Sequence, residues 1–330
     1  REPLETLIRT DHFTMFPLHP VVFLLLWSSG AGFPTLSLMP GPGQQETVAF
    51  PRSEITQVVL LGTGTPNAEP DRWGSSVAVV VNGTPYVVDA GAGVVRRASA
   101  AFEGGVAGLE VKRLATLFLT HLHSDHTVGL PDIMYSPWVL ERVAPLRIIG
   151  PPGTADMVGH IEEAYEADVQ VRIDGLEPAN PTGYRTEVQE ITAGVVFSDE
   201  NVTVTAFEVP HGGWPEAFGY RFETPDRVVV ISGDTAPTEA VVKHCDGCDI
   251  LVHEVYSQAG FDRRSPEWQR YHAASHTSAP DLGRLATRAG AKLLVLTHQL
   301  LWGATPEELL AEVRSTFDGA VVYGKDLDVY

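Results

Sequence analysis

Cysteine is scarce in this chain of 330 residues. The two cysteines, Cys245 and Cys248, form one C-x-x-C pair with no second pair elsewhere. A lone pair in a turn-like segment before a strand predicts no disulfide framework, and we expect no redox or zinc role for it. Cysteine content therefore leaves the cellular compartment open.

Positive charge is also in short supply. The chain has 23 lysine and arginine residues against 42 aspartate and glutamate residues, a net charge of −19. A protein that binds nucleic acid over a wide face needs positive surface, so this balance argues against an extended nucleic-acid surface. The doublets Arg96 with Arg97 and Arg263 with Arg264 are expected on solvated helix faces. A bound metal ion would be a local source of positive charge.

Long apolar runs are missing as well. The run at residues 21–27 is far too short to span a membrane. Small residues and a Pro-Gly segment follow it, as in an export signal, but a basic leader is lacking. We predict an N-terminal arm or signal-like segment at residues 1–45 and a catalytic domain at residues 46–330. A signal would imply export to the periplasm, and an arm a cytoplasmic protein.

The densest group of chemically active side chains follows the apolar residues 117–119. His121, His123, Asp125 and His126 lie within six positions. Neutral imidazole and carboxylate are ligands that zinc accepts. His121 and His123 point the same way in an extended chain, and the other two then turn toward a second point. One loop can thus serve two adjacent cations.

The hydrophobic pattern beyond residue 46 alternates between strands and helices. Strands are predicted at residues 55–61, 76–81, 86–89, 117–119, 146–149, 201–208, 218–222, 228–231, 250–252 and 293–296. Helices are predicted at residues 94–102, 156–165, 280–288 and 306–314, the last with Thr305 as N-cap. The fold class is therefore α/β, with mixed sheets covered by helices.

Three further ligand candidates each follow a predicted strand. They are His211, Asp234 and His298. One such residue is often only a capping or solvated group. Three of them, together with the first cluster, predict a single converging site.

These segments together resemble the metallo-β-lactamase superfamily, and within it the ribonuclease Z and arylsulfatase branch. The motifs are THLHSDH at 120–126, SGDT at 232–235, LTH at 296–298, LGTGTP at 61–66, FGYRF at 218–222, LVHE at 251–254 and SHTS at 275–278. The resemblance implies a four-layer αββα sandwich with two mixed sheets face to face.

The resemblance also implies a binuclear metal site. It assigns His121, His123 and His211 to a first ion, Asp125, His126 and His298 to a second, and Asp234 to a bridge between them. Two Zn²⁺ ions are expected, with Mn²⁺ or Fe²⁺ as alternatives. A hydroxide held between two cations is a nucleophile at neutral pH.

Three further residues are implied to support the chemistry. His276, oriented by Glu254, would protonate or stabilise the leaving oxygen. The alternative is that His276 only belongs to the start of the next helix. Asp89 would hold the metal loop by hydrogen bonds, and Asp125 would serve catalysis as well as metal binding.

The substrate is expected to be a sulfate or phosphate ester of a small molecule. Residues 222–232 leave no room for a transfer-RNA arm, and the net charge disfavours RNA. A ribonuclease Z-type transfer-RNA 3′ endonuclease and a β-lactam or lactone hydrolase are the alternatives. A metal-free binding relative is the non-enzymatic one, and a homodimer is left open.

Four tryptophans lie near the motif loops. Trp73, Trp138, Trp214 and Trp302 are candidates either to line an apolar pocket or to pack in the core.

Overall fold

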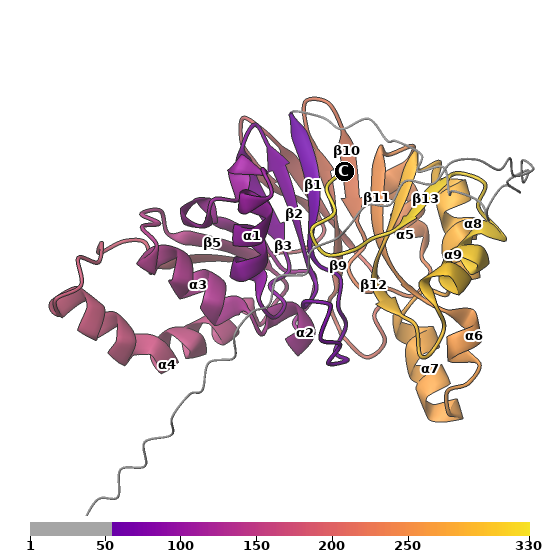
Figure 1. The fold of residues 1–330 in the computed structure, drawn as a ribbon, viewed down its shortest axis with the longest axis horizontal. Coiled ribbons are helices and arrows are strands. Elements are labelled where there is room, and N and C mark those ends of the chain that lie inside the picture. Colours follow the sequence, from indigo (N-terminus) through magenta and orange to yellow (C-terminus); the bar gives the residue numbers. More distant parts are fainter. Residues whose placement is uncertain (1–54) are drawn as a thin grey trace, which may run out of the picture. The chain divides into compact units, whose positions relative to one another are not determined.

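Residues 55–330 are described by the computed structural model (Figure 1). The predictions for residues 1–45 lie outside the described residues. No helix within residues 55–330 has the length and apolar character that crossing a membrane requires.

The first sheet has six strands in sequence order. They are β1 (Thr56–Gly62), β2 (Ser76–Val81), β3 (Thr84–Val88), β4 (Thr116–Phe118), β5 (Leu146–Gly150) and β6 (Thr186–Glu190). The first three pair antiparallel, and β3 to β6 pair parallel. Parallel strands need crossover connections, which the helices between them provide.

The second sheet has seven strands in the order β13-β12-β11-β10-β9-β8-β7. They are β7 (Gly194–Ser198), β8 (Thr203–Glu208), β9 (Phe218–Glu223), β10 (Val228–Ile231), β11 (Ile250–Tyr256), β12 (Leu293–Leu300) and β13 (Ala320–Tyr323). Pairing is antiparallel from β7 to β10 and parallel from β10 to β13.

Helices cover the outer face of each sheet (Figure 1). The covering helices are α1 (Val94–Glu103), α3 (Leu130–Val139) and α4 (Thr154–Asp174) on the first sheet, and α5 (Glu239–Cys245), α8 (Ala279–Ala289) and α9 (Pro306–Arg314) on the second. The other helices are α2 (Ser124–Thr127), α6 (Gln258–Phe261) and α7 (Pro266–Ser275). Between the sheets, residues such as Phe118 of the first pack with Tyr220 and Phe222 of the second. The predicted αββα sandwich is confirmed.

The predicted bounds of several strands and helices agree with the structure. The segments β2, β10 and α9 have the predicted bounds, and Thr305 caps α9 in a capping box with Glu308. The strands β11 and β12 run four residues further than predicted, and α4 extends well beyond residues 156–165. Pattern reading missed β6 and β7 because most of their side chains are exposed or half-buried.

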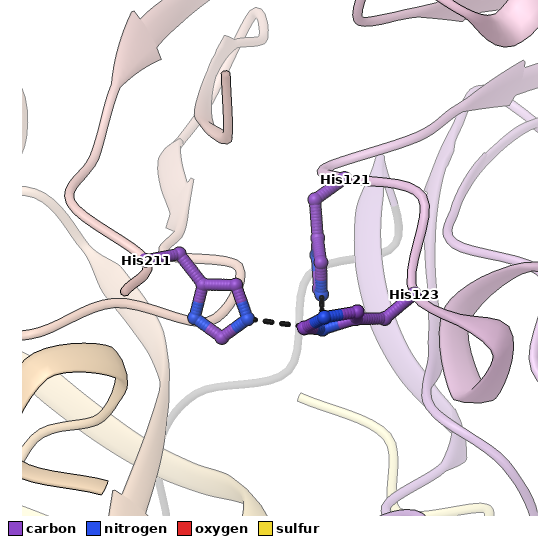
Figure 2. A group of neighbouring side chains, drawn as sticks. All are labelled: His121, His123 and His211. Atoms are coloured by element: carbon purple, nitrogen blue, oxygen red, sulfur yellow. Dashed lines mark hydrogen bonds between the residues drawn. The ribbon is translucent and has the colours of Figure 1, made fainter. Parts of the chain in front are cut away.

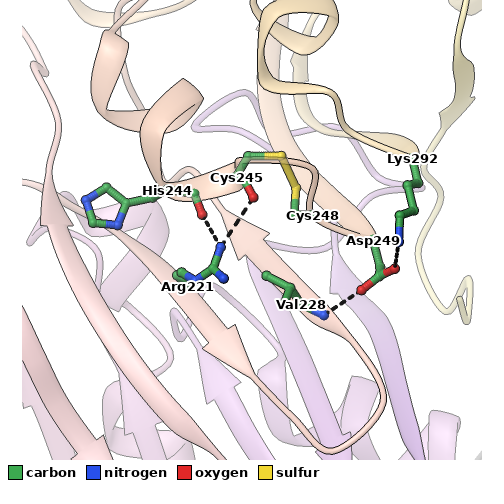
Figure 3. The surroundings of a disulfide bond; sticks show 7 residues. All are labelled: Arg221, Val228, His244, Cys245, Cys248, Asp249 and Lys292. Atoms are coloured by element: carbon green, nitrogen blue, oxygen red, sulfur yellow. Dashed lines mark hydrogen bonds and ion pairs between the residues drawn. A yellow bond between two sulfur atoms is a disulfide. The ribbon is translucent and has the colours of Figure 1, made fainter.

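Cys245 and Cys248 are joined by a disulfide bond, a pairing that the sequence analysis did not expect (Figure 3). Both are buried where α5 turns toward β11. Arg221 Nη1 donates to the carbonyl oxygens of His244 and Cys245 at 2.5 and 3.3 Å. The bond therefore closes a packed turn between α5 and β11.

Candidate metal centre

The predicted ligands come from loops and strand ends of both sheets. The segment after β4 carries His121 and His123, and α2 begins directly afterwards. His211 follows β8, Asp234 follows β10, and His298 lies within β12. His298 has a φ of 44°, in the left-handed region. Such a conformation is uncommon in non-glycine residues overall, and the examples that occur cluster at functional sites.

Three imidazoles converge from two loops (Figure 2). His121 Nε2 and His211 Nε2 each lie 3.1 Å from His123 Nδ1. Two nitrogen ligands at 2.0–2.1 Å from a tetrahedral zinc ion are about 3.3 Å apart. The spacing of the three nitrogens therefore fits a single metal ion.

A second group forms around Asp125. Its Oδ2 lies 3.1 Å from His298 Nε2 and 3.5 Å from His126 Nε2. Asp234 stands between the two groups, because its Oδ2 is 3.4 Å from His126 Nε2, 3.6 Å from His298 Nε2 and 4.0 Å from His121 Nε2. The seven side chains therefore fall into three overlapping groups that could hold metal ions.

Burial prepares the first group to bind metal. His121 is fully buried, and burial lowers the pKa of its imidazole well below the ordinary value. Burial likewise lowers the pKa of His123 and His211. A metal ligand must be neutral imidazole, and these shifts favour that form at neutral pH.

The second group has the opposite electrostatics. Burial opposes the charged form of His126, yet the carboxylates of Asp234 and Asp89 raise its pKa well above the ordinary value. The pKa of His298 is raised in the same way, against burial, by Asp234 and Asp125. His126 Nε2 is buried and has no hydrogen-bond partner among residues 55–330. A cation placed there would replace the proton and satisfy that nitrogen.

Hydrogen bonds hold the ligands in orientation. Asp89 Oδ1 accepts from the Thr120 backbone N–H at 2.8 Å, and Asp89 Oδ2 accepts from His126 Nδ1 at 2.8 Å. His211 Nδ1 donates to the carbonyl oxygen of Ser275 at 2.8 Å. Such contacts fix the tautomer and direction of a ligand ring. The structure thus shows the hydrogen bonds predicted for Asp89.

His276 and Glu254 lie beside the ligands. His276 Nδ1 is 3.3 Å from Glu254 Oε2 and 4.0 Å from Asp234 Oδ2. Burial raises the pKa of Glu254 well above its ordinary value, and burial lowers the pKa of His276 to about 4. Ser278, and not His276, caps α8. The structure therefore places His276 at the site.

A cavity of about 650 Å³ opens beside the ligands. Its lining includes His123, Asp125, Asp234, His276 and His298, together with the wall residues Arg264, Trp268, Tyr271, His272 and Trp302.

Of these wall residues, the sequence indicated only Trp302 as a candidate to line a pocket. Of the other tryptophans it named, Trp138 is in the core, Trp73 packs against Arg97, and the Trp214 ring lies 4.7 Å from the His123 ring. The expectation that Arg264 faces solvent on a helix was wrong, since it is half-buried in the cavity wall. The spacing of Trp268, Tyr271 and His272 at i, i+3 and i+4 would have indicated one helix face.

Comparison with known proteins identifies similar chains over most of this length. Residues 84–299 match the family model for the β-lactamase superfamily domain. Ribonuclease Z of Mycolicibacterium gilvum is 34% identical over 281 residues, which cover 83% of this chain and 95% of that protein. Ribonuclease Z of Mycobacterium bovis is also 34% identical, over 83% of this chain and 97% of its own.

Solved structures agree with these matches. Human tRNase Z, short form, has a TM-score of 0.60 and 25% identity, over 83% of this chain and 98% of its own. A metallo-β-lactamase fold protein from Bacillus subtilis has a TM-score of 0.63 and 18% identity, over 84% of this chain and 99% of its own. The second likeness shows the fold alone.

These relatives contradict the expected substrate. The sequence predicted a small-molecule ester and no extended nucleic-acid surface, whereas the similar proteins are ribonucleases. The net charge misled because it sums over the whole chain, while a metal site supplies positive charge locally where a phosphate is bound.

Proposed function

Because the chain belongs to the ribonuclease Z branch of the metallo-β-lactamase superfamily and is a metal-dependent hydrolase, we propose that it is a transfer-RNA 3′-processing endonuclease with two Zn²⁺ ions. The ribonuclease Z relatives support the choice of substrate, and the two-metal part of the proposal is supported by the position of Asp234 Oδ2 between two groups of candidate ligands. A single carboxylate oxygen within 4.0 Å of nitrogens from both groups suits a bridge between adjacent cations.

The residues present fit the two ions. His121, His123 and His211 would hold the first, and Asp125, His126 and His298 the second, with Asp234 shared. When bound, the ions supply activation of water and neutralisation of negative charge on the phosphoryl group. Most ligands are histidines and the carboxylates are few, which favours zinc over magnesium or calcium.

Proton transfer to the leaving oxygen falls to the His276 and Glu254 pair. Burial raises the pKa of Glu254 well above its ordinary value and lowers the pKa of His276 to about 4, so burial favours the uncharged form of both side chains. Glu254 Oε1 accepts from the Thr277 N–H at 2.7 Å, which anchors the carboxyl. In phosphodiester cleavage the leaving ribose oxygen must gain a proton, and a positioned acid contributes about 10²–10⁴-fold in rate.

The test is side-by-side turnover by zinc-loaded protein of a precursor transfer RNA and of bis(p-nitrophenyl) phosphate. The proposal expects one endonucleolytic cut at the 3′ side of the precursor, abolished by chelation and restored by zinc. Asp234→Ala is the inactive control. Cleavage of the aryl phosphodiester with the precursor left intact would overturn the RNA assignment and leave the hydrolase standing.

A further inference from the structure

Aromatic rings line the same cavity as the candidate metal ligands. The aromatic wall is defined as Trp268, Tyr271 and His272 of α7 together with Trp302, which follows β12. The His272 ring lies 5.5 Å from the His276 ring, 4.3 Å from Trp302 and 5.5 Å from Trp268, the last nearly parallel at 20°. The rings therefore form a continuous surface beside the reaction centre.

Arg264 adds positive charge to this wall. Its guanidinium carbon lies 5.2 Å from the centroid of the Trp268 ring and 5.3 Å from that of Trp302, within cation–π range. No carboxylate of residues 55–330 forms an ion pair with it. Acidic residues outnumber basic ones in this chain by 42 to 23, so most guanidinium groups could find a carboxylate partner, and Arg264 has none among the described residues. Guanidinium groups match phosphate geometry well.

His272 is polar, buried and unpartnered. His272 is only 6% exposed, and neither ring nitrogen has a hydrogen-bond partner among the described residues. Buried polar atoms are nearly always paired, so core packing alone does not account for this ring. Trp268 and Tyr271 remain 51% and 43% exposed. Rings that served only as core packing would be buried.

A nucleotide satisfies all of these features. Proteins recognise unpaired RNA by stacking bases on aromatic rings and on arginine planes, and by hydrogen bonds to base edges. The volume of about 650 Å³ lies within the range of pockets that bury drug-sized molecules, ample for a nucleotide. Apart from the candidate metal ligands, Glu267 is the one carboxylate of residues 55–330 that lines the cavity, and it pairs with Arg270 at 3.9 Å.

We propose that the aromatic wall and Arg264 form a nucleotide subsite that holds one unpaired nucleotide of the RNA substrate next to the scissile phosphate. Its base stacks on the rings, and Arg264 contacts its phosphate. This inference rests on the proposed function, and it adds the substrate position that the metal centre alone does not define.

The test pairs protein variants with missing bases. Trp268→Ala and Trp268→Phe are compared on a precursor transfer RNA and on the same RNA made abasic at the nucleotide on either side of the cut. Loss of one stacked base corresponds to about 5- to 140-fold in kcat/KM. Trp268→Ala should lower kcat/KM by this factor on intact RNA. On the one abasic RNA that lacks the stacked base, the same substitution should change kcat/KM little. Trp268→Phe should retain most of the rate on intact RNA.

Matched controls are available on the same molecule. Tyr165 on α4 is 40% exposed, like Tyr271, but lies outside this cavity, so Tyr165→Ala should leave kcat/KM unchanged while Tyr271→Ala lowers it. Arg185 lies over the Tyr184 ring at 5.7 Å, and Arg185→Ala is the control for Arg264→Ala. Equal losses for Trp268→Ala on intact and both abasic RNAs would overturn the subsite.

A binding measurement separates failure of the subsite from failure of the proposed function. Tryptophan fluorescence is titrated with the RNA trinucleotide AAA, without turnover. Quenching that is lost in Trp268→Ala and weakened in Arg264→Ala supports the subsite, even for a protein that leaves precursor transfer RNA intact. Absence of quenching in a protein that cuts the precursor overturns the subsite and leaves the proposed function in place.

Discussion

Asp89 Oδ2 and His126 Nδ1 lie 2.8 Å apart, although 37 positions separate the two residues in sequence. The same carboxylate accepts from the Thr120 hydroxyl at 2.9 Å. Asp89 therefore connects the strand end after β3 to the metal loop after β4, two parallel neighbours. This contact fixes which His126 nitrogen faces the second metal position.

Asp89→Ala should weaken binding of one metal ion without removing any ligand. Loss of an orienting partner typically lowers metal affinity 10- to 100-fold. Zinc titration against a competing chelator measures the effect. Asp168→Ala, on the exposed face of α4, is the control. Unchanged affinity in Asp89→Ala would show that the ring is held by other contacts.

Asp234→Ala and His276→Ala should separate metal binding from proton transfer. Asp234 lies between both ligand groups, so its removal should reduce bound zinc and abolish turnover. His276→Ala should keep zinc and lose about 10²–10⁴-fold in kcat. Zinc content by elemental analysis, measured beside kcat, distinguishes the two. Loss of zinc in His276→Ala would make His276 a ligand and contradict its assigned role.

The two ions should leave at different pH values on acidification. His126 and His298 have raised pKa values, so protons compete for them at a higher pH. His121, His123 and His211 have lowered pKa values and stay neutral below the ordinary value near 6.5. We expect bound zinc to fall in two steps, the ion at Asp125, His126 and His298 first. A single step for both ions would be contrary to this assignment.

Phe118→Ala should destabilise the fold between the sheets. Its ring meets Phe197, Tyr220 and Phe222 at 5.3–5.8 Å, and the side chain is fully buried. Truncation of such a core phenylalanine costs about 3–5 kcal/mol in the free energy of unfolding. Phe102→Ala, at a residue 42% exposed, should cost far less. Urea unfolding of both variants checks the difference.

Strand ends, and the side chains that converge beyond them, could be predicted because their signals are local. His121 and His123 follow the apolar strand β4 of the first sheet, and His211 follows β8 of the second sheet. The pairing of Asp89 with His126 could be anticipated only through the resemblance, since nothing in the spacing of two distant residues indicates contact.

The aromatic wall and the substrate could not be predicted in the same way. Arg264 and Trp302 lie 38 positions apart in sequence and meet only through the fold, a tertiary contact without a local pattern. Net charge is a sum over the chain and does not report the environment of one arginine. Composition therefore pointed away from RNA, while the cavity wall offers a cation and stacking rings.

The most direct measurement follows cleavage of precursor transfer RNA while zinc is titrated into metal-free protein. The account predicts that 3′ cleavage rises with zinc and saturates at two equivalents per chain, with no cleavage by Asp234→Ala at any zinc concentration. Saturation at one equivalent, or an intact precursor at full occupancy, would contradict it.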